Sequence, residues 1–143
     1  MTHVPPILLA DDNPTDAELT IRALEIGGVS NPVVWVQDGE AALDFVFRRG
    51  QYAQRSPGNP VLVLVDMHMP RIDGLDVLEQ IKADEGTRAT PVVVMSSSDQ
   101  AADMLRSYAR HANSYLVKPV EFKQFTDQVA LLGKYWTRVN RSG

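Results

Sequence analysis

Three aspartates each follow directly on a short run of apolar residues. Asp11 and Asp12 come after residues 7–10, and Asp66 comes after residues 61–65. If these two runs are neighbouring parallel strands, their carboxyl ends meet at one edge of a sheet, about 4.8 Å apart. Carboxylates at that spacing repel one another unless a cation lies between them. Because Mg²⁺ (or Mn²⁺) prefers oxygen ligands and phosphate, the three aspartates predict a site for metal and phosphoryl chemistry.

Two further polar residues follow apolar runs in the same way. Lys118 comes after residues 115–117, and its ammonium can pair with a carboxylate or a phosphoryl oxygen. Ser96 ends the run that begins at residue 92, and its hydroxyl can donate to a phosphoryl oxygen. Each also has an ordinary structural interpretation, because most lysines are surface residues and a serine at a turn can cap a helix, as Ser98 can.

Five continuous apolar runs alternate with amphipathic segments along the chain. The runs cover residues 7–10, 33–36, 61–65, 92–95 and 115–117. Continuous rather than alternating apolar runs are typical of parallel strands that are buried on both faces. We therefore predict an α/β fold with a parallel sheet that is covered on both faces. If the five strands take the order 2-1-3-4-5 of a flavodoxin-like, doubly wound (βα)5 fold, the first and third strands are neighbours.

The segments between the runs have the spacing of amphipathic helices. Asn13 and Pro14 predict the N-cap and first turn of the first helix. Apolar stripes mark the five helices at Ala17, Ile21 and Leu24; Ala42, Phe45 and Val46; Leu75, Leu78 and Ile81; Ala102, Leu105 and Ala109; and Phe122, Phe125, Val129, Leu132 and Trp136. Residues 51–60, rich in Pro, Gly, Ser and Asn, predict a surface loop before the third strand.

Composition narrows the classes of function. The chain has 143 residues, a net charge of −4 and no cysteine. Lack of cysteine excludes disulfides, zinc-thiolate sites and thiol catalysis, and the lack of a basic stripe argues against nucleic-acid binding. The N-terminus predicts neither a signal peptide nor a membrane span, so we expect a cytoplasmic protein. We expect residues 1–143 to form one domain, with a core at about 6–138 and no output domain.

These motifs together resemble the receiver domains of two-component response regulators. The acidic pair at residues 11–12 matches the family pattern, and residues 66–74, Asp-Met-His-Met-Pro-Arg-Ile-Asp-Gly, resemble its phosphoacceptor segment. Residues 91–96 resemble its fourth strand with the terminal hydroxyl, and residues 115–119, Tyr-Leu-Val-Lys-Pro, resemble its aromatic-x-x-Lys-Pro segment. The resemblance covers residues 6–136, and its strength comes from four motifs in the family's order.

The resemblance implies a role for each of these residues. Asp66 is then the nucleophile that takes a phosphoryl group from a histidine kinase, which makes the protein a signalling switch rather than an enzyme. Asp12, Asp66 and the backbone carbonyl of His68 would bind Mg²⁺ directly, and Asp11 would bind it through water. Lys118 would pair with the phosphoryl group. After phosphorylation, Ser96 would move inward to bond it, and Tyr115 would be the aromatic ring that rotates.

Finer details resemble the small single-domain regulators of phytochrome-type histidine kinases. These details are Asp-Asn-Pro-x-Asp at 12–16, residues 38–41, the long loop through Tyr52, residues 107–108 and 112–115, Phe125 and Trp136. Members of that group commonly form homodimers through the fourth helix, the fifth strand and the fifth helix, and Tyr135 and Trp136 could serve such a contact. Core packing of the last helix explains Trp136 equally well.

Two alternatives stay open at this point. Haloacid-dehalogenase-like phosphohydrolases use similar Asp and Mg²⁺ chemistry, but they place a second Asp two residues after the nucleophile, where this chain has His68. A binding module of the same fold that works without phosphate is the other alternative. It would not need every acidic position of the family to be filled, as they are here.

Overall fold

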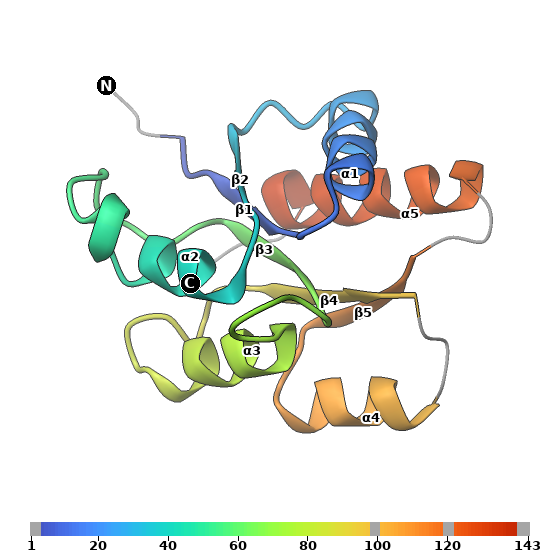
Figure 1. Cartoon of the computed structure of the whole chain (residues 1–143). Coiled ribbons are helices and arrows are strands. Elements are labelled where there is room, and N and C mark those ends of the chain that lie inside the picture. Colours follow the sequence, from blue (N-terminus) through green and yellow to red (C-terminus); the bar gives the residue numbers. More distant parts are fainter. Residues whose placement is uncertain (1–3, 98–100, 119–121, 140–143) are drawn as a thin grey trace.

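The computed structural model describes residues 4–97, 101–118 and 122–139, and within these residues strands and helices alternate (Figure 1). The strands are β1 (Ile7–Ala10), β2 (Val33–Val36), β3 (Leu62–Asp66), β4 (Val92–Ser96) and β5 (Ser114–Val117). The helices are α1 (Pro14–Ile26), α2 (Gly39–Val46), α3 (Gly74–Ala83), α4 (Ala101–Ala109) and α5 (Phe122–Lys134). A 3₁₀ turn, η1 (Gly50–Tyr52), follows α2, and a π-helical turn, η2 (Tyr135–Val139), follows α5.

The five strands form one parallel sheet in the order β2-β1-β3-β4-β5, which confirms the predicted fold. Helices α1 and α5 cover one face of the sheet, and α2, α3 and α4 cover the other (Figure 1). In this order β1 and β3 are neighbours, with Ala10 paired to Val65. The residues that follow these two strands therefore emerge side by side at one edge of the sheet.

The apolar runs are buried on both faces, as their continuity indicated. Every residue of β1, β3 and β4 is buried. Alternate residues enter two separate cores, because successive side chains of a strand point to opposite faces. Leu8 and Val63 pack with α2 and α3, whereas Ile7 and Leu64 pack with α1 and α5. Two apolar layers thus hold the central strands in a fixed register.

Side-chain caps fix where three of the helices begin. The Asn13 side chain accepts a hydrogen bond from the backbone N–H of Asp16, and Pro14 occupies the first turn, so the predicted start of α1 is confirmed. Asp38 and Asp73 cap α2 and α3 in the same way. Each of these helices starts directly after a strand or its turn, so the caps hold the loops at the carboxyl edge of the sheet.

The predicted apolar stripe of α4 is wrong. Leu105 is 68% exposed, and Ala102 and Ala109 are exposed as well. Among the α4 side chains that the structure describes, the buried one is that of Ser107, whose hydroxyl donates to the carbonyl of Asp103 one turn earlier. A small side chain that satisfies its own hydroxyl inside the helix can pack against the sheet, so the larger apolar side chains of α4 face outward.

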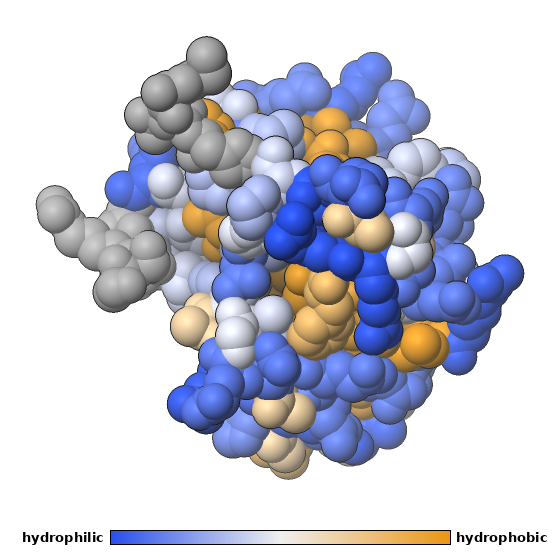
Figure 2. Space-filling model, turned by 90° about the vertical axis from the view of Figure 1, so that its left-hand side faces the viewer, coloured by the Kyte–Doolittle hydropathy of each residue, from blue (hydrophilic) through white to orange (hydrophobic). Residues whose placement is uncertain are grey.

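The connection between α2 and β3 is ordered rather than a loose loop. Arg55 stacks over the ring of Phe45, 4.3 Å from its centre, and donates to the carbonyls of Phe45 and Val46 at the end of α2. Its guanidinium also bonds the carbonyls of Ser56 and Gly58. Figure 2 shows the face of the molecule that carries this segment. There, strongly hydrophilic side chains (blue) surround a small hollow lined by hydrophobic ones (orange). One arginine thus ties the segment to the helix before it.

Two sequence predictions fall on residues that the structure does not describe. Ser98, the candidate cap of α4, and Pro119, the residue after Lys118, lie outside the described ranges. Within those ranges, each helix is too short or too polar to cross a membrane. The stripe of α5 is confirmed at Phe125 and Val129, which are buried against α1 and the sheet.

Gly74 lets α3 begin directly beneath the end of β3. A Cβ atom at this position would lie 2.1 Å from the carbonyl oxygen of Asp66, closer than any real contact. The backbone N–H of Gly74 also donates to the carbonyl of Met67. The glycine eight residues after Asp66 is therefore required by close packing of two backbone segments.

We expect Gly74→Ala to destabilise the protein by about 3 kcal/mol, because the added methyl group must displace backbone rather than a flexible side chain. Urea unfolding followed by circular dichroism measures the change. Gly86→Ala is the matched control, since its new Cβ would meet only the exposed Asp84 side chain at 3.2 Å. We expect that control to stay within about 0.5 kcal/mol of wild type. Equal stability of the two variants would contradict the role given to Gly74.

Candidate functional site

The three predicted aspartates converge at the carboxyl edge of the sheet. Asp11 follows β1 and has no exposed surface, Asp66 ends β3 and is 7% exposed, and Asp12 is exposed. One carboxylate oxygen from each of them lies within 4.8 Å of the others. This donor set of three carboxylates, open to solvent on the side of Asp12, fits a hard divalent cation such as Mg²⁺ or Mn²⁺.

Lys118 joins the carboxylates into one network. Its Nζ lies 2.8 Å from Asp11 Oδ2, 3.1 Å from Asp66 Oδ2 and 3.1 Å from Asp16 Oδ2. The residue follows β5, and its backbone N–H donates to the carbonyl of Ser96 on β4. The lysine side chain thus reaches from the end of one strand across to the ends of β3 and β1.

The electrostatics of Asp66 and Lys118 are coupled by burial and proximity. Burial raises the pKa of Asp66 to about 6, because the opposing charge of Lys118 offsets only part of the lost hydration, and Asp11 adds repulsion. Burial by itself would lower the pKa of Lys118, but hydrogen bonding to Asp11 and the charges of Asp66 and Asp11 hold that pKa above its ordinary value. Lys118 therefore stays positively charged, and Asp66 is a carboxylate at neutral pH.

Ser96 lies on the strand next to Asp66, at the same edge. Met95 is the register partner of Asp66, so Ser96 is one residue further along β4. It has no exposed surface, whereas the neighbouring Ser97 is exposed and Ser98 lies outside the described residues. Of the hydroxyls that the structure describes here, that of Ser96 is the one buried beside Asp66, and its role in binding a phosphoryl group stays a prediction.

Tyr115 and His68 lie at the sides of this edge. Tyr115 is half-buried on β5 and packs against the core beneath α3. Its backbone N–H donates to the hydroxyl of Tyr108 on α4, 3.1 Å away. His68 is exposed, and its backbone N–H points to Asp66 Oδ1 at 3.4 Å. The predicted use of its carbonyl as a metal ligand and the predicted rotation of Tyr115 stay predictions.

Two residues contact the site that sequence reasoning did not assign to it. Asp16 binds Lys118 directly, as given above, and the indole N–H of Trp35 on β2 donates to the carbonyl of Asp11 at 2.8 Å. Asp16 belongs to the Asp-Asn-Pro-x-Asp motif, so its spacing was visible in the sequence. Its partner lies 102 residues away, which only the folded chain reveals.

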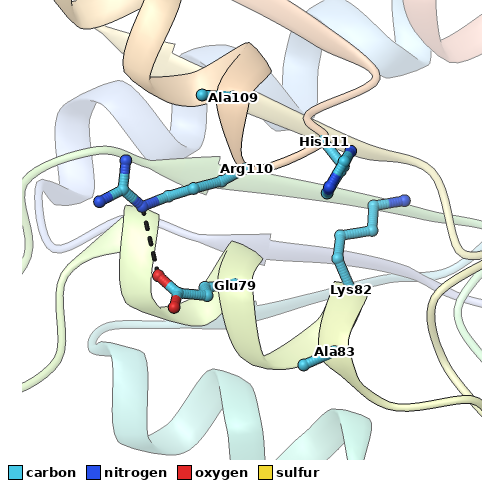
Figure 3. A pocket seen from close by; sticks show the side chains of 6 residues that line it. All are labelled: Glu79, Lys82, Ala83, Ala109, Arg110 and His111. Carbon is cyan, nitrogen blue, oxygen red and sulfur yellow. Dashed lines mark hydrogen bonds and ion pairs between the residues drawn. The ribbon is translucent and has the colours of Figure 1, made fainter.

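A hollow of about 500 Å³ lies away from this edge, between the ends of α3 and α4 (Figure 3). Lys82 extends toward it, but its Nζ donates to the carbonyls of Arg88 and Thr90 and to the side chain of Asn113. Arg110 pairs with Glu79 across it (Figure 3). The Lys82 and Arg110 side chains therefore hold helix and loop ends together. The residues suited to metal and phosphoryl chemistry lie instead at the carboxyl edge of the sheet.

Comparison with known proteins places this arrangement in a family. A model of the response regulator receiver domain matches residues 7–130. The chain is 43% identical over 136 residues to the probable methanogenesis regulatory protein FilR2 of Methanothrix harundinacea, covering 95% of this chain and 86% of that protein.

Two solved structures are similar over nearly the whole chain. The phosphorylated cyanobacterial phytochrome response regulator RcpA superposes with a TM-score of 0.88 at 34% identity, covering 97% of this chain and 98% of that one. The Mn²⁺-bound form of response regulator Rcp1 gives 0.87 at 31% identity, covering 97% and 99%. Nothing in the structure or in these relatives favours a phosphohydrolase or a phosphate-independent binding module. The chain therefore belongs to the response regulator receiver domain family and is a two-component response regulator.

Proposed function

We propose that Asp66 accepts a phosphoryl group from a phosphohistidine of a histidine kinase. The observation that carries the proposal is the position of Lys118, which holds its charge against Asp66 and Asp11 where three carboxylates converge. An Asp66 oxygen forms the new bond to phosphorus while the P–N bond of the phosphohistidine breaks and the imidazole leaves. Lys118 offsets the negative charge of the phosphoryl oxygens, so the chemistry depends on positioning and electrostatics.

The same proposal assigns a divalent-metal site. Asp12 and Asp66, with the backbone carbonyl of His68, would hold Mg²⁺ or Mn²⁺ directly, and Asp11 would hold it through water. The clustering of the three carboxylates supports this assignment, and the relative Rcp1 has a Mn²⁺-bound form. The cation supplies charge neutralisation for the phosphoryl oxygens. Buried Asp11 meanwhile holds Lys118 in place.

The switch would act through Ser96 and Tyr115. A phosphoryl group on Asp66 replaces the single charge of the carboxylate by about two negative charges, and it adds strong acceptors beside the buried Ser96. A charge-assisted hydrogen bond from the Ser96 hydroxyl would draw it inward, and the ring of Tyr115 would take up the space that it leaves. Tyr115 is bonded through its backbone to Tyr108 on α4, so this change would reach the exposed face of α4.

The partner kinase is proposed to be of the phytochrome type, and the site of action to be the cytoplasm. RcpA, a phytochrome response regulator, supports the partner, because its structure matches nearly the whole of this chain. FilR2 has a higher sequence identity to this chain than RcpA and is named a probable methanogenesis regulatory protein. A test of partner kinases should therefore include histidine kinases with other input domains. We further propose that the domain at residues 1–143 transmits a signal and has no turnover on small substrates.

We expect wild-type protein to gain the mass of one phosphoryl group when incubated with acetyl phosphate and Mg²⁺, and Asp66→Asn to gain none. The amide cannot serve as the nucleophile, and chelation of Mg²⁺ removes the charge neutralisation that the reaction needs. Intact-mass spectrometry measures the adduct. Asp12→Asn serves as a comparison that lowers metal binding but keeps the nucleophile. Full labelling of Asp66→Asn would overturn the assignment of the phosphoacceptor.

The affinity for Mg²⁺ should fall as the pH is lowered. Asp66 has a pKa raised to about 6, so between pH 7.5 and pH 5 its carboxylate becomes protonated and a proton competes with the cation. We expect an affinity about tenfold weaker at pH 5, measured by isothermal titration calorimetry at constant ionic strength. Asp66→Asn should bind Mg²⁺ more weakly and with a flatter pH dependence. An affinity in wild type that does not change over this range would contradict the metal role of Asp66.

The exposed apolar side chains of α4 support the proposed homodimer through α4, β5 and α5. Met104, Leu105 and Tyr108 are 36%, 68% and 44% exposed on this helix. We expect Leu105→Glu to shift a dimer to monomer in light-scattering measurements, because a charge would be buried in the contact. Ile26→Glu, at an equally exposed apolar residue of α1, should leave the dimer intact. A monomeric wild type, or the same shift in both variants, would refute this interface.

A further inference from the structure

A closed ring of hydrogen bonds links the loop after β1 to Lys118. The backbone N–H of Asn13 donates to Asp11 Oδ1 at 3.0 Å, and the backbone N–H of Asp16 donates to the Asn13 side chain at 3.1 Å. Lys118 Nζ then donates to Asp16 Oδ2 and to Asp11 Oδ2, which closes the ring. The two carboxylates that hold Lys118 on this side are therefore fixed relative to each other by the turn at Asn13.

The Lys118 ammonium donates three hydrogen bonds, to Asp11, Asp16 and Asp66. Phosphorylation of Asp66 would affect these three contacts differently. The contact with Asp66 must be replaced, because Asp66 becomes the phosphorylated residue and Lys118 has to bond a phosphoryl oxygen instead. The contacts with Asp11 and Asp16 lie outside that exchange. They can keep the nitrogen in place while its third partner changes, so that little reorganisation is needed when the phosphoryl group arrives.

The capping hydrogen bond of α1 is made by Asn13 and not by the Asp16 carboxylate. The cap of α1 is the Asn13 side chain, which accepts from the backbone of Asp16, and Pro14 sets the first turn. The carboxylate is therefore free to turn inward, where it meets Lys118, although about a third of the side chain is exposed. It also lies outside the cluster of carboxylate oxygens that fits a metal ion.

We propose that Asp16 is a positioning residue for phosphoryl transfer: with Asp11 it clamps the Lys118 ammonium at the place where the incoming phosphoryl oxygens need its charge. The proposal rests on the proposed function of Asp66 as phosphoacceptor. Asp16 touches neither the phosphoryl group nor the metal, and it acts through Lys118. In the reaction with acetyl phosphate, an Asp66 oxygen bonds to phosphorus, the bond from phosphorus to the acetyl oxygen breaks, and acetate leaves.

If Asp16 acts by holding Lys118, its loss should slow phosphoryl transfer and leave Mg²⁺ binding nearly unchanged, so the test measures both properties. The initial rate of labelling by acetyl phosphate at saturating Mg²⁺ is followed by intact-mass spectrometry, and the dissociation constant for Mg²⁺ is measured by calorimetry. We expect Asp16→Asn to label about tenfold more slowly than wild type, as loss of one charge-assisted hydrogen bond predicts. Its Mg²⁺ affinity should stay within about twofold. Asp16→Ala, which keeps the Asn13 cap but has no acceptor at all, should label at least as slowly.

Glu18→Gln is the matched control for charge. It removes one carboxylate from the same helix, but Glu18 is exposed and pairs with Arg22 at 3.6 Å. We expect both measured properties of this variant to stay within about twofold of wild type. A wild-type rate in Asp16→Asn, an equal fall in Glu18→Gln, or a loss of Mg²⁺ affinity as large as the loss of rate would each overturn the clamp. If wild type itself takes no phosphoryl group, the proposed function fails, and the inference fails with it.

Discussion

The ammonium of Lys118 among the carboxylates of Asp11, Asp16 and Asp66 is the contact on which the site depends. Asp11 has no exposed surface and Lys118 is 9% exposed, so neither charge is well hydrated. A buried charge without a partner is strongly destabilising, and each of these groups is acceptable only because the others are present. The cost of this arrangement is the lost hydration of the Asp66 carboxylate, which the charge of Lys118 offsets only in part.

That loss of hydration decides how Asp66 titrates. Burial and Asp11 raise the pKa of Asp66 to about 6 despite the nearby lysine. Because this pKa is raised in the folded chain, the stability it contributes is present at low pH and is lost as the pH rises through about 6. A bound cation would offset this cost, since it adds positive charge where the carboxylates crowd. The fold thus holds the Asp66 carboxylate in an environment that a nearby cation would make more favourable.

The sheet supplies the rigidity that such a cluster needs. The residues of the site lie at or just beyond the ends of four neighbouring strands, β1, β3, β4 and β5. In that order they are Asp11, Asp66, Ser96 and Lys118. Both faces of these strands are packed, so the strand ends cannot shift independently. The close approach of Gly74 to the carbonyl of Asp66 fixes the turn beyond β3 as well. Outside this packed region, Tyr115 and the apolar side chains of α4 are partly exposed.

The sequence by itself indicated the strands, because continuous apolar runs are a local pattern typical of buried parallel strands. With the strand order 2-1-3-4-5 of a doubly wound sheet, it also predicted the convergence of Asp11, Asp12 and Asp66 at the strand ends. It misassigned the buried face of α4, since the apolar side chains of this helix lie on its exposed side, whereas Ser107, which satisfies its own hydroxyl, is buried. Only the tertiary structure decided that Asp16 and Trp35 contact the site. Their partners are side chains and carbonyls far away in the chain, and such contacts depend on three-dimensional packing that no local pattern records.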